Sequence, residues 1–136
     1  MRSILFEECL QALEENVTIL SLEETNKIFE LFESNIPIYQ GGSRIDWKKI
    51  KEHIALSSPK EITSSLEKLL KNTFDSTVYI FWNDASLPVI KTDLILAISK
   101  FEDVTAVGFE TWFFNPWEGF IIEYYYLKEL NIGLIK

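Results

Sequence analysis

The sequence predicts an α+β fold, in which N-terminal helices pack on a mainly antiparallel sheet of about four strands formed by the C-terminal half. Apolar residues recur at helical spacing up to residue 72, and β-branched and aromatic residues dominate several runs after residue 76. A turn signal, Asn115-Pro116-Trp117-Glu118-Gly119, separates two of those runs. Helices first and strands later are typical of helices on one face of an antiparallel sheet. At 136 residues, the chain is expected to form one domain, 1–136.

Two helices are expected within the first 35 residues. The first spans Ser3 to Glu15, and the second begins at Ser21, where Ser-Leu-Glu-Glu matches a capping box. The second should end near Asn35, because Pro37 disfavours helical backbone in the residue before it. Their apolar stripes are Leu5, Phe6, Cys9, Leu10 and Leu13, followed by Ile28, Phe29, Leu31 and Phe32.

Two more helices are expected before the pattern changes. Asp46 caps a short helix from Trp47 to Leu56, which follows a flexible loop at residues 40–43. The next helix starts at residues 58–61, where a proline occupies the first helical position, and it ends near residue 72.

The second half is expected to form the sheet. Thr77 to Trp82 is a strand by composition and is followed by turn formers at residues 83–86. Thr92 or Asp93 caps one helix that runs to about residue 101. The rest of the chain is expected to form a hairpin around the turn at 115–119, with a further short strand at its end.

The net charge of −8 is spread unevenly. Residues 1–40 hold two basic and eight acidic side chains, residues 41–74 hold seven and four, and residues 75–136 hold four and nine. Such a field repels nucleic-acid backbones and anionic membranes and attracts a basic macromolecule. We expect a basic protein partner, no direct nucleic-acid binding and no membrane binding. The alternative is that the acidity only aids solubility.

The chain contains one cysteine and one histidine, which restricts its chemistry. Cys9 cannot form an internal disulfide, no apolar run is long enough to span a bilayer, and the polar start is unlike a signal peptide, so we expect a cytoplasmic location. Cys9 and His53 are too few soft ligands for a structural zinc site, and no calcium-loop pattern occurs. Neither a metal nor another cofactor is expected.

No catalytic motif stands out, so we expect no enzymatic activity. Cys9 lies on an apolar helical stripe, as an inert core thiol does, and His53 lies among lysines, as a solvated imidazole does. The remaining enzymatic alternative is a pair of carboxylates, Glu110 and Glu123, that face each other across the hairpin and act as acid and base. Adjacent acids on a sheet are more often surface residues.

The terminal strands favour a binding surface instead. Strand alternation places Glu110 beside Trp112 on one face, and Glu123 beside Tyr125 on one face of the next strand. Large aromatic side chains carry much of the energy at interface centres. Trp117 and Glu118, at the tip of the turn, are expected to be exposed. Exposure of Glu110 and Glu123 is expected as well, because unpaired carboxylates are costly to bury. Core packing of most of the aromatic residues is the alternative. The predicted binding residues are Asp84, Glu110, Trp112, Trp117, Glu118, Glu123 and Tyr125.

Three segments carry a family resemblance: Ile80-Phe81-Trp82-Asn83-Asp84, Thr111-Trp112-Phe113-Phe114-Asn115-Pro116 and Gly119-Phe120-Ile121-Ile122-Glu123-Tyr124-Tyr125. Together they cover roughly residues 76–136, and this region resembles small bacterial immunity proteins of contact-dependent growth-inhibition and other polymorphic-toxin systems. The resemblance implies a cytoplasmic, non-enzymatic protein that holds a cognate toxin domain, often a nuclease, and covers its active site or an adjoining surface. It transfers no binding residue by motif.

Two other classes stay open. One is a regulatory or scaffold protein that binds a different basic protein. The other is an enzyme or a small-molecule-binding domain whose aromatic residues line a pocket. A deep apolar cavity ringed by Trp112, Tyr124 and Glu110 would favour this second class, and a flat acidic surface would count against it.

Overall fold

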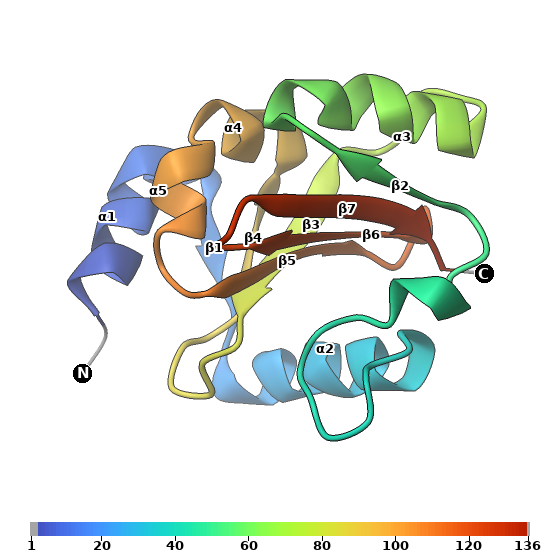
Figure 1. The fold of residues 1–136 in the computed structure, drawn as a ribbon. Helices are drawn as coiled ribbons and strands as arrows, with labels where there is room; N and C mark the ends of the chain where they lie inside the picture. The colour runs from blue at the N-terminus through green and yellow to red at the C-terminus, as the bar shows by residue number, and fades with distance from the viewer. Residues whose placement is uncertain (1–2, 136) are drawn as a thin grey trace.

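The computed structural model describes residues 3–135, which form an α+β fold around a seven-stranded antiparallel sheet (Figure 1). The strand order across the sheet is β1-β4-β3-β5-β6-β7-β2. The strands are β1 (Thr18–Ile19), β2 (His53–Leu56), β3 (Thr77–Trp82), β4 (Ile90–Asp93), β5 (Glu110–Asn115), β6 (Phe120–Tyr125) and β7 (Glu129–Leu134). The α-helices are α1 (Ile4–Leu13), α2 (Leu22–Asn35), α3 (Ile62–Leu70), α4 (Leu94–Ser99) and α5 (Phe101–Thr105).

Local signals predicted most of these elements. α1, α2 and α3 lie within the predicted helices. The capping box at Ser21 is present: the Ser21 hydroxyl accepts a hydrogen bond from Glu24 N, and the Glu24 carboxylate accepts one from Ser21 N. Strand β3 has the predicted bounds, and β5 and β6 form the predicted hairpin, with β7 as the further strand. Asp93 caps α4, but the predicted single helix is divided at Lys100 into α4 and α5.

The predicted helix from Trp47 to Leu56 is wrong. Only Trp47–Lys49 forms a 3-10 turn, and β2 follows it and pairs with β7. Ile54 and Leu56 pack against the core, whereas His53 and Ala55 are exposed, so the period in this segment is two residues. An apolar residue at every second position is the pattern of a strand with one buried face. The spacing of Trp47, Ile50 and Ile54, three and four residues apart, resembled a helix and concealed that pattern.

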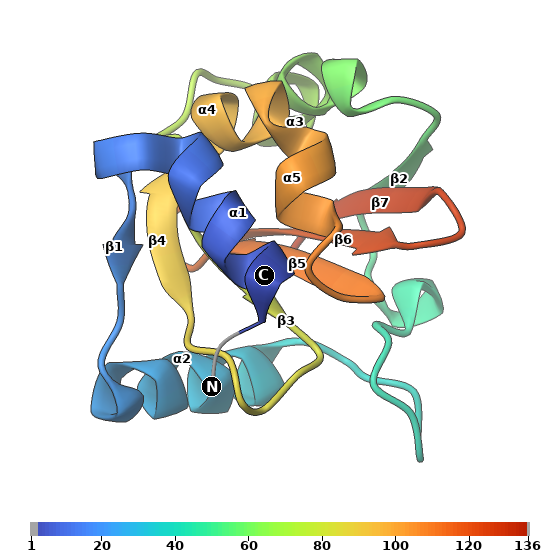
Figure 2. The same ribbon diagram turned by 90° about the vertical axis from the view of Figure 1, so that its left-hand side faces the viewer.

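The sheet is larger than predicted, and it is covered on both faces. Strands β1, β2 and β4 have two to four residues and were missed because so short a run shows no clear alternation. α1, α3, α4 and α5 cover one face, and α2 covers the other (Figure 2). The predicted arrangement, with all helices on one face, is therefore wrong.

Two apolar clusters occupy the two faces. The first lies under α1, α3, α4 and α5 and includes Phe6, Cys9, Leu66, Val104 and Phe113. The second lies under α2 and the segment at residues 36–50, which we call the α2-side segment, and includes Phe32, Ile45, Phe81, Trp112 and Ile121. The second cluster belongs to the face on which the predicted binding residues gather.

Candidate functional site

Most of the predicted binding residues lie on the α2 side of the sheet. In the β5–β6 pairing, Trp112 is opposite Glu123 and Glu110 is opposite Tyr125, so these four side chains share one face, as the alternation predicted. Trp112 belongs to the apolar cluster under α2, which identifies the face. The strand pairing therefore brings together two acids and two aromatic residues from the two arms of the hairpin.

Glu123 is fully buried, so the prediction that it is exposed is wrong. Its Oε2 accepts hydrogen bonds from Ile45 N at 2.8 Å and from Trp112 Nε1 at 3.0 Å, and its Oε1 accepts from Trp47 Nε1 at 3.0 Å. Arg44 supplies a guanidinium nitrogen at 3.5 Å from Oε1. A carboxylate with this many donors compensates for its lost hydration, which the expectation of an unpaired acid did not include. Glu123 thus ties the α2-side segment to the sheet.

Glu110 is also buried, at 8% exposure, and so are Trp112 and Trp82. The Glu110 Oε1 accepts from the Ser43 hydroxyl at 3.1 Å, and Asn83 Nδ2 donates to the same hydroxyl at 3.1 Å. Trp82 donates its ring N–H to Val104 O. The predicted exposure of Glu110 is therefore wrong, because Glu110 connects the α2-side segment to the end of β5. Trp112 fills the core, as the alternative for most of the aromatic residues stated.

The geometry gives no support to a catalytic pair of Glu110 and Glu123. Residues opposite one another in the hairpin are Trp112 and Glu123, so the two glutamates are diagonal neighbours. A general acid or base needs contact with the substrate, and Glu123 has no exposed surface and already holds donors on both oxygens.

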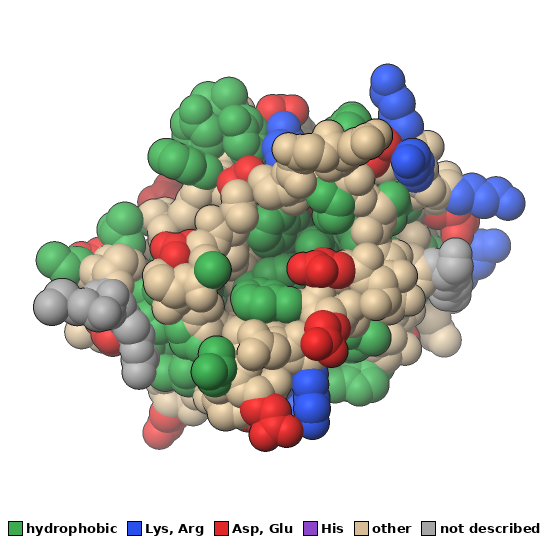
Figure 3. Space-filling view, turned by 90° about the horizontal axis from the view of Figure 1, so that it is seen from below, with side chains coloured by type: hydrophobic (Ala, Val, Ile, Leu, Met, Phe, Trp, Pro, Cys, Tyr) green, Lys and Arg blue, Asp and Glu red, His purple; other side chains and the backbone are tan. Residues whose placement is uncertain are grey.

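A hollow of 570 Å³ opens beside α2, and we call it the α2 groove. Figure 3 shows it from the α2 side as a depression with apolar side chains at its bottom and acidic side chains around it. Its walls are α2, the α2-side segment and the loop after β3. The lining residues are Phe29, Phe32, Glu33, Ile36, Ile38, Gly42, Ser43, Phe81, Trp82, Asn83, Asp84, Ala85 and Trp112.

Asp84 is exposed on this groove, as predicted. Its Oδ1 accepts hydrogen bonds from the Ser86 hydroxyl at 2.6 Å and from Ser86 N at 3.0 Å, and these bonds hold the pKa of the Asp84 carboxyl below its usual value. Hydrogen bonds to the charged form favour that form. Asp84 therefore presents a negative charge at neutral pH.

Trp117 and Glu118 lie at the opposite end of the hairpin from Asp84, Glu110 and Tyr125, about 17 Å away along β5. Trp117 is 56% exposed, as predicted, and its ring contacts that of Tyr79 in a tilted arrangement, with centroids 5.3 Å apart. Glu118 is half-buried, and its Oε2 accepts from Asp75 N. The predicted set is therefore divided between the two ends of the hairpin.

Tyr125 is half-buried at the end near the α2 groove, with the Arg44 guanidinium carbon 4.1 Å from its ring centre. Tyr124 points to the opposite face, where its ring packs edge-on against Phe101 at 5.0 Å. The cavity ringed by Trp112, Tyr124 and Glu110 that would favour a small-molecule site is therefore not formed, because consecutive strand residues face opposite ways.

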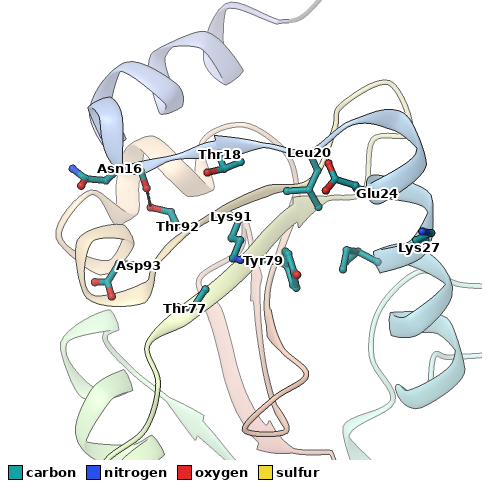
Figure 4. A pocket seen from close by; sticks show the side chains of 11 residues that line it. Asn16, Thr18, Leu20, Glu24, Lys27, Thr77, Tyr79, Lys91, Thr92 and Asp93 are labelled. Atoms are coloured by element: carbon teal, nitrogen blue, oxygen red, sulfur yellow. Dashed lines mark hydrogen bonds between the residues drawn. The ribbon is translucent and has the colours of Figure 1, made fainter.

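A second hollow, of 580 Å³, lies between α2 and the β1–β4–β3 edge of the sheet (Figure 4). Glu24 and Lys27 of α2 line it together with Lys91 and Asp93 of β4, so both signs of charge are present. The Lys91 ammonium also lies 5.4 Å from the ring centre of Trp117. With mixed charge, this hollow has no selectivity for a partner of one sign.

Cys9 and His53 have no catalytic or metal-binding arrangement. Burial raises the pKa of the Cys9 thiol to about 12, which makes it an unreactive core thiol, as predicted. His53 is exposed on β2, with Nδ1 2.7 Å from Ile50 O. Within residues 3–135, no three His, Cys, Asp or Glu side chains are placed to hold a metal ion.

In the same range, no helix combines the length and apolar character needed to cross a membrane.

Comparison with known protein families finds a match to an immunity protein family. The family described as CdiI immunity protein EcoliA0-like matches residues 3–133, nearly the whole chain. The chain belongs to this family. Among curated proteins, none matches the sequence. The resemblance noted for residues 76–136 therefore extends through the helical half, which was too generic in sequence to show it.

Membership identifies a CdiI-type immunity protein of contact-dependent growth inhibition, a family that suggests neutralisation of a cognate toxin. In this immunity protein, sequence reasoning missed part of the α2 groove, namely Phe29, Phe32 and Glu33 of α2 and Phe81 of β3. The helical pattern placed Phe29 and Phe32 on the core stripe. They also line the groove because the end of α2 lies beside the loop after β3, an arrangement that the sequence does not show.

Proposed function

We propose that this immunity protein neutralises its toxin by direct binding through the α2 side of the sheet, without catalysis of its own. Six of the seven predicted residues lie on that side: four by strand register, Asp84 on the α2 groove, and Trp117 through its ring contact with Tyr79. This gathering of acids and aromatic residues on one face is the observation that carries the proposal.

Burial divides the seven predicted residues into two roles. Asp84, Trp117, Glu118 and Tyr125 have accessible surface and form the proposed direct contacts. The other three (Glu110, Trp112 and Glu123) hold the surface in place from below. An interface of standard size covers about 800 Å² on each partner, which is roughly 30 Å across, so one toxin domain can span both ends of the hairpin.

The chemistry of the partner follows from the charge of this protein. A net charge of −8 favours a basic toxin domain, and we propose that this domain is a nuclease, because a nuclease site must hold phosphates and is therefore basic. Electrostatic attraction then speeds capture of the toxin. Such capture takes place in the cytoplasm, where a toxin that degrades nucleic acid acts.

The decisive experiment combines binding with protection. The product of the gene immediately upstream is tested for capture by this protein at several salt concentrations. Cells that express the upstream product are then tested for growth rescue by this protein. We expect capture that weakens with salt, and restored growth. If the upstream product is captured but is not toxic, the protein is a regulatory partner of another basic protein. If it is toxic and neither captured nor neutralised, direct neutralisation is refuted.

A single variant tests how far the contact extends. Glu118→Lys reverses the charge beside Trp117, and we expect weaker toxin capture with a changed salt dependence if this end of the hairpin is covered. Capture and rescue equal to those of the natural protein would restrict the contact to the end near Asp84.

A further inference from the structure

We propose that the α2 groove is the docking site for a lysine- or arginine-bearing segment of the cognate toxin. This inference rests on the proposed function, direct toxin binding, and adds the place and the chemistry of the contact. The hollow measures 570 Å³, within the range of roughly 300–1,000 Å³ that binding pockets occupy. It is open to solvent, so an extended chain or a protruding loop can enter it (Figure 3).

The bottom of the groove suits the stem of a long cationic side chain. Phe29 and Phe32 of α2 and Phe81 of β3 pack edge-to-face, with ring centres 5.0 Å apart for Phe32 and Phe81 and 5.6 Å apart for Phe29 and Phe81. Lysine and arginine bury their methylene stems along apolar surface, and their charged groups are attracted to aromatic faces. This aromatic lining therefore accepts both parts of such a side chain.

The charged residues of the groove are all acidic. Glu33 stands on the α2 wall and Asp84 on the opposite loop, and both are exposed. Among residues 3–135, neither carboxylate has a lysine or arginine within salt-bridge distance, and no basic residue lines the groove. The hollow in Figure 4 differs, because Lys27 and Lys91 line it. Of these two hollows, the α2 groove alone offers uncompensated acids around an aromatic bottom.

The walls of the groove are held in place before any partner arrives. Ser43 bridges Glu110 and Asn83 at the inner wall, and the buried Glu123 binds the backbone of Ile45 just beyond it. Arg44, which follows the lining residue Ser43 in the chain, is paired with Glu123 and Glu129, each at 3.5 Å. A surface that is already ordered loses less conformational entropy on binding.

Charge also selects the occupant. A second copy of this chain carries the same charge of −8 and would bring acids toward Glu33 and Asp84. A basic toxin segment instead supplies the missing countercharges and covers the apolar bottom. Electrostatic complementarity and burial of aromatic surface therefore favour the same partner.

The test compares two doubly neutralised variants against the upstream-encoded toxin domain. Glu33→Gln with Asp84→Asn removes two charges from the groove, and the asparagine side chain retains an oxygen that can accept from Ser86. The control, Glu102→Gln with Asp103→Asn, removes two exposed charges from α5 on the opposite face. We expect the groove variant to bind on the order of tenfold more weakly, with a shallower salt dependence, and the control to bind within about twofold of the natural protein.

A photo-crosslink identifies the occupant. Benzoyl-phenylalanine replaces Ala85, an exposed lining residue, and in a control it replaces Ile95 on α4. We expect the Ala85 probe, and not the Ile95 probe, to capture a toxin peptide that contains lysine or arginine. Equal binding by the two double variants, capture of a second copy, or capture of a peptide without a basic residue overturns the inference. If one of these results occurs but the natural protein still binds and neutralises the toxin, the proposal of direct neutralisation is retained and only the groove inference fails. If the natural protein neither binds nor neutralises the toxin, both proposals fail.

Discussion

The two faces of the sheet are built from different chemistry. The face under α1, α3, α4 and α5 is closed by apolar packing, with residues such as Phe6, Leu66 and Val104 fully buried. The face under α2 contains buried carboxylates, a segment tied down by hydrogen bonds and an open groove. The first face is therefore closed without polar groups, whereas the second face carries the polar groups and the groove that we propose for toxin binding. The predictions below test this division.

The largest expected effect comes from Glu123→Ala. Removal of the carboxylate leaves the N–H groups of Ile45, Trp47 and Trp112 without their acceptor and leaves Arg44 paired with Glu129 alone. Loss of one partner of a buried ion pair costs about 3–5 kcal/mol. Urea unfolding measures the loss. Toxin affinity should fall as well, even where the variant is folded, because the groove wall is released. Native affinity in the folded variant would contradict this role for Glu123.

Leu66→Ala tests the opposite face. Leu66 is fully buried on α3, and its truncation should lower the free energy of unfolding by about 3 kcal/mol through lost burial and a residual cavity. Toxin affinity should remain that of the natural protein under conditions where the variant is folded. A parallel loss of affinity, measured by calorimetry on folded protein, would show that the two faces are not separable. Glu67→Ala, at the exposed neighbouring position, is the control.

Gly133→Ala tests how closely the α2-side segment approaches the sheet. A Cβ at this position would lie 2.8 Å from Trp47 Cζ3 and 3.0 Å from Glu52 O, so we expect a loss of about 2 kcal/mol from overpacking. Gly42→Ala is the matched control, because its Cβ would make ordinary contacts no closer than 3.6 Å. Equal unfolding midpoints for the two variants would show that the α2-side segment moves away from the added methyl group without loss of stability.

Cys9 provides the smallest effect and a test by pH. The thiol has a pKa of about 8.5 in the unfolded chain, whereas burial raises its pKa in the folded protein to about 12. The stability contributed by the neutral thiol is therefore present below the unfolded pKa and is lost as the pH rises toward the folded pKa. Between about pH 8.5 and 10 the natural protein should lose up to about 1.4 kcal/mol per pH unit relative to Cys9→Ala. Stability curves that run in parallel over this range would contradict a dry environment around the thiol.

Local patterns were sufficient for much of the fold. The capping box at Ser21, the turn at residues 115–119 and the composition of residues 77–82 each predicted an element that is present. The same reasoning failed where partners lie far away in the chain. β2 was predicted as a helix because its status as an edge strand depends on pairing with β7, and β1 and β4 are too short to carry a pattern.

The predicted site shows the same division. Alternation along β5 and β6 correctly placed Glu110 with Trp112 and Glu123 with Tyr125. Exposure was predicted for both glutamates because an unpaired acid is costly to bury, and it was wrong because Ser43, Arg44, Ile45 and Trp47 come from the α2-side segment to meet them. No spacing in the sequence signals those contacts.

The sequence by itself determined the charge of this immunity protein, most of its helices and the hairpin on which most of the proposed binding residues lie, since these depend on neighbouring residues and on periodicity. Only the tertiary structure decided which acids are buried and which are free, and where a groove opens. The burial of the Glu123 carboxylate depends on a donor 78 positions away in the chain, and a groove depends on how α2, the α2-side segment and the loop after β3 meet in space.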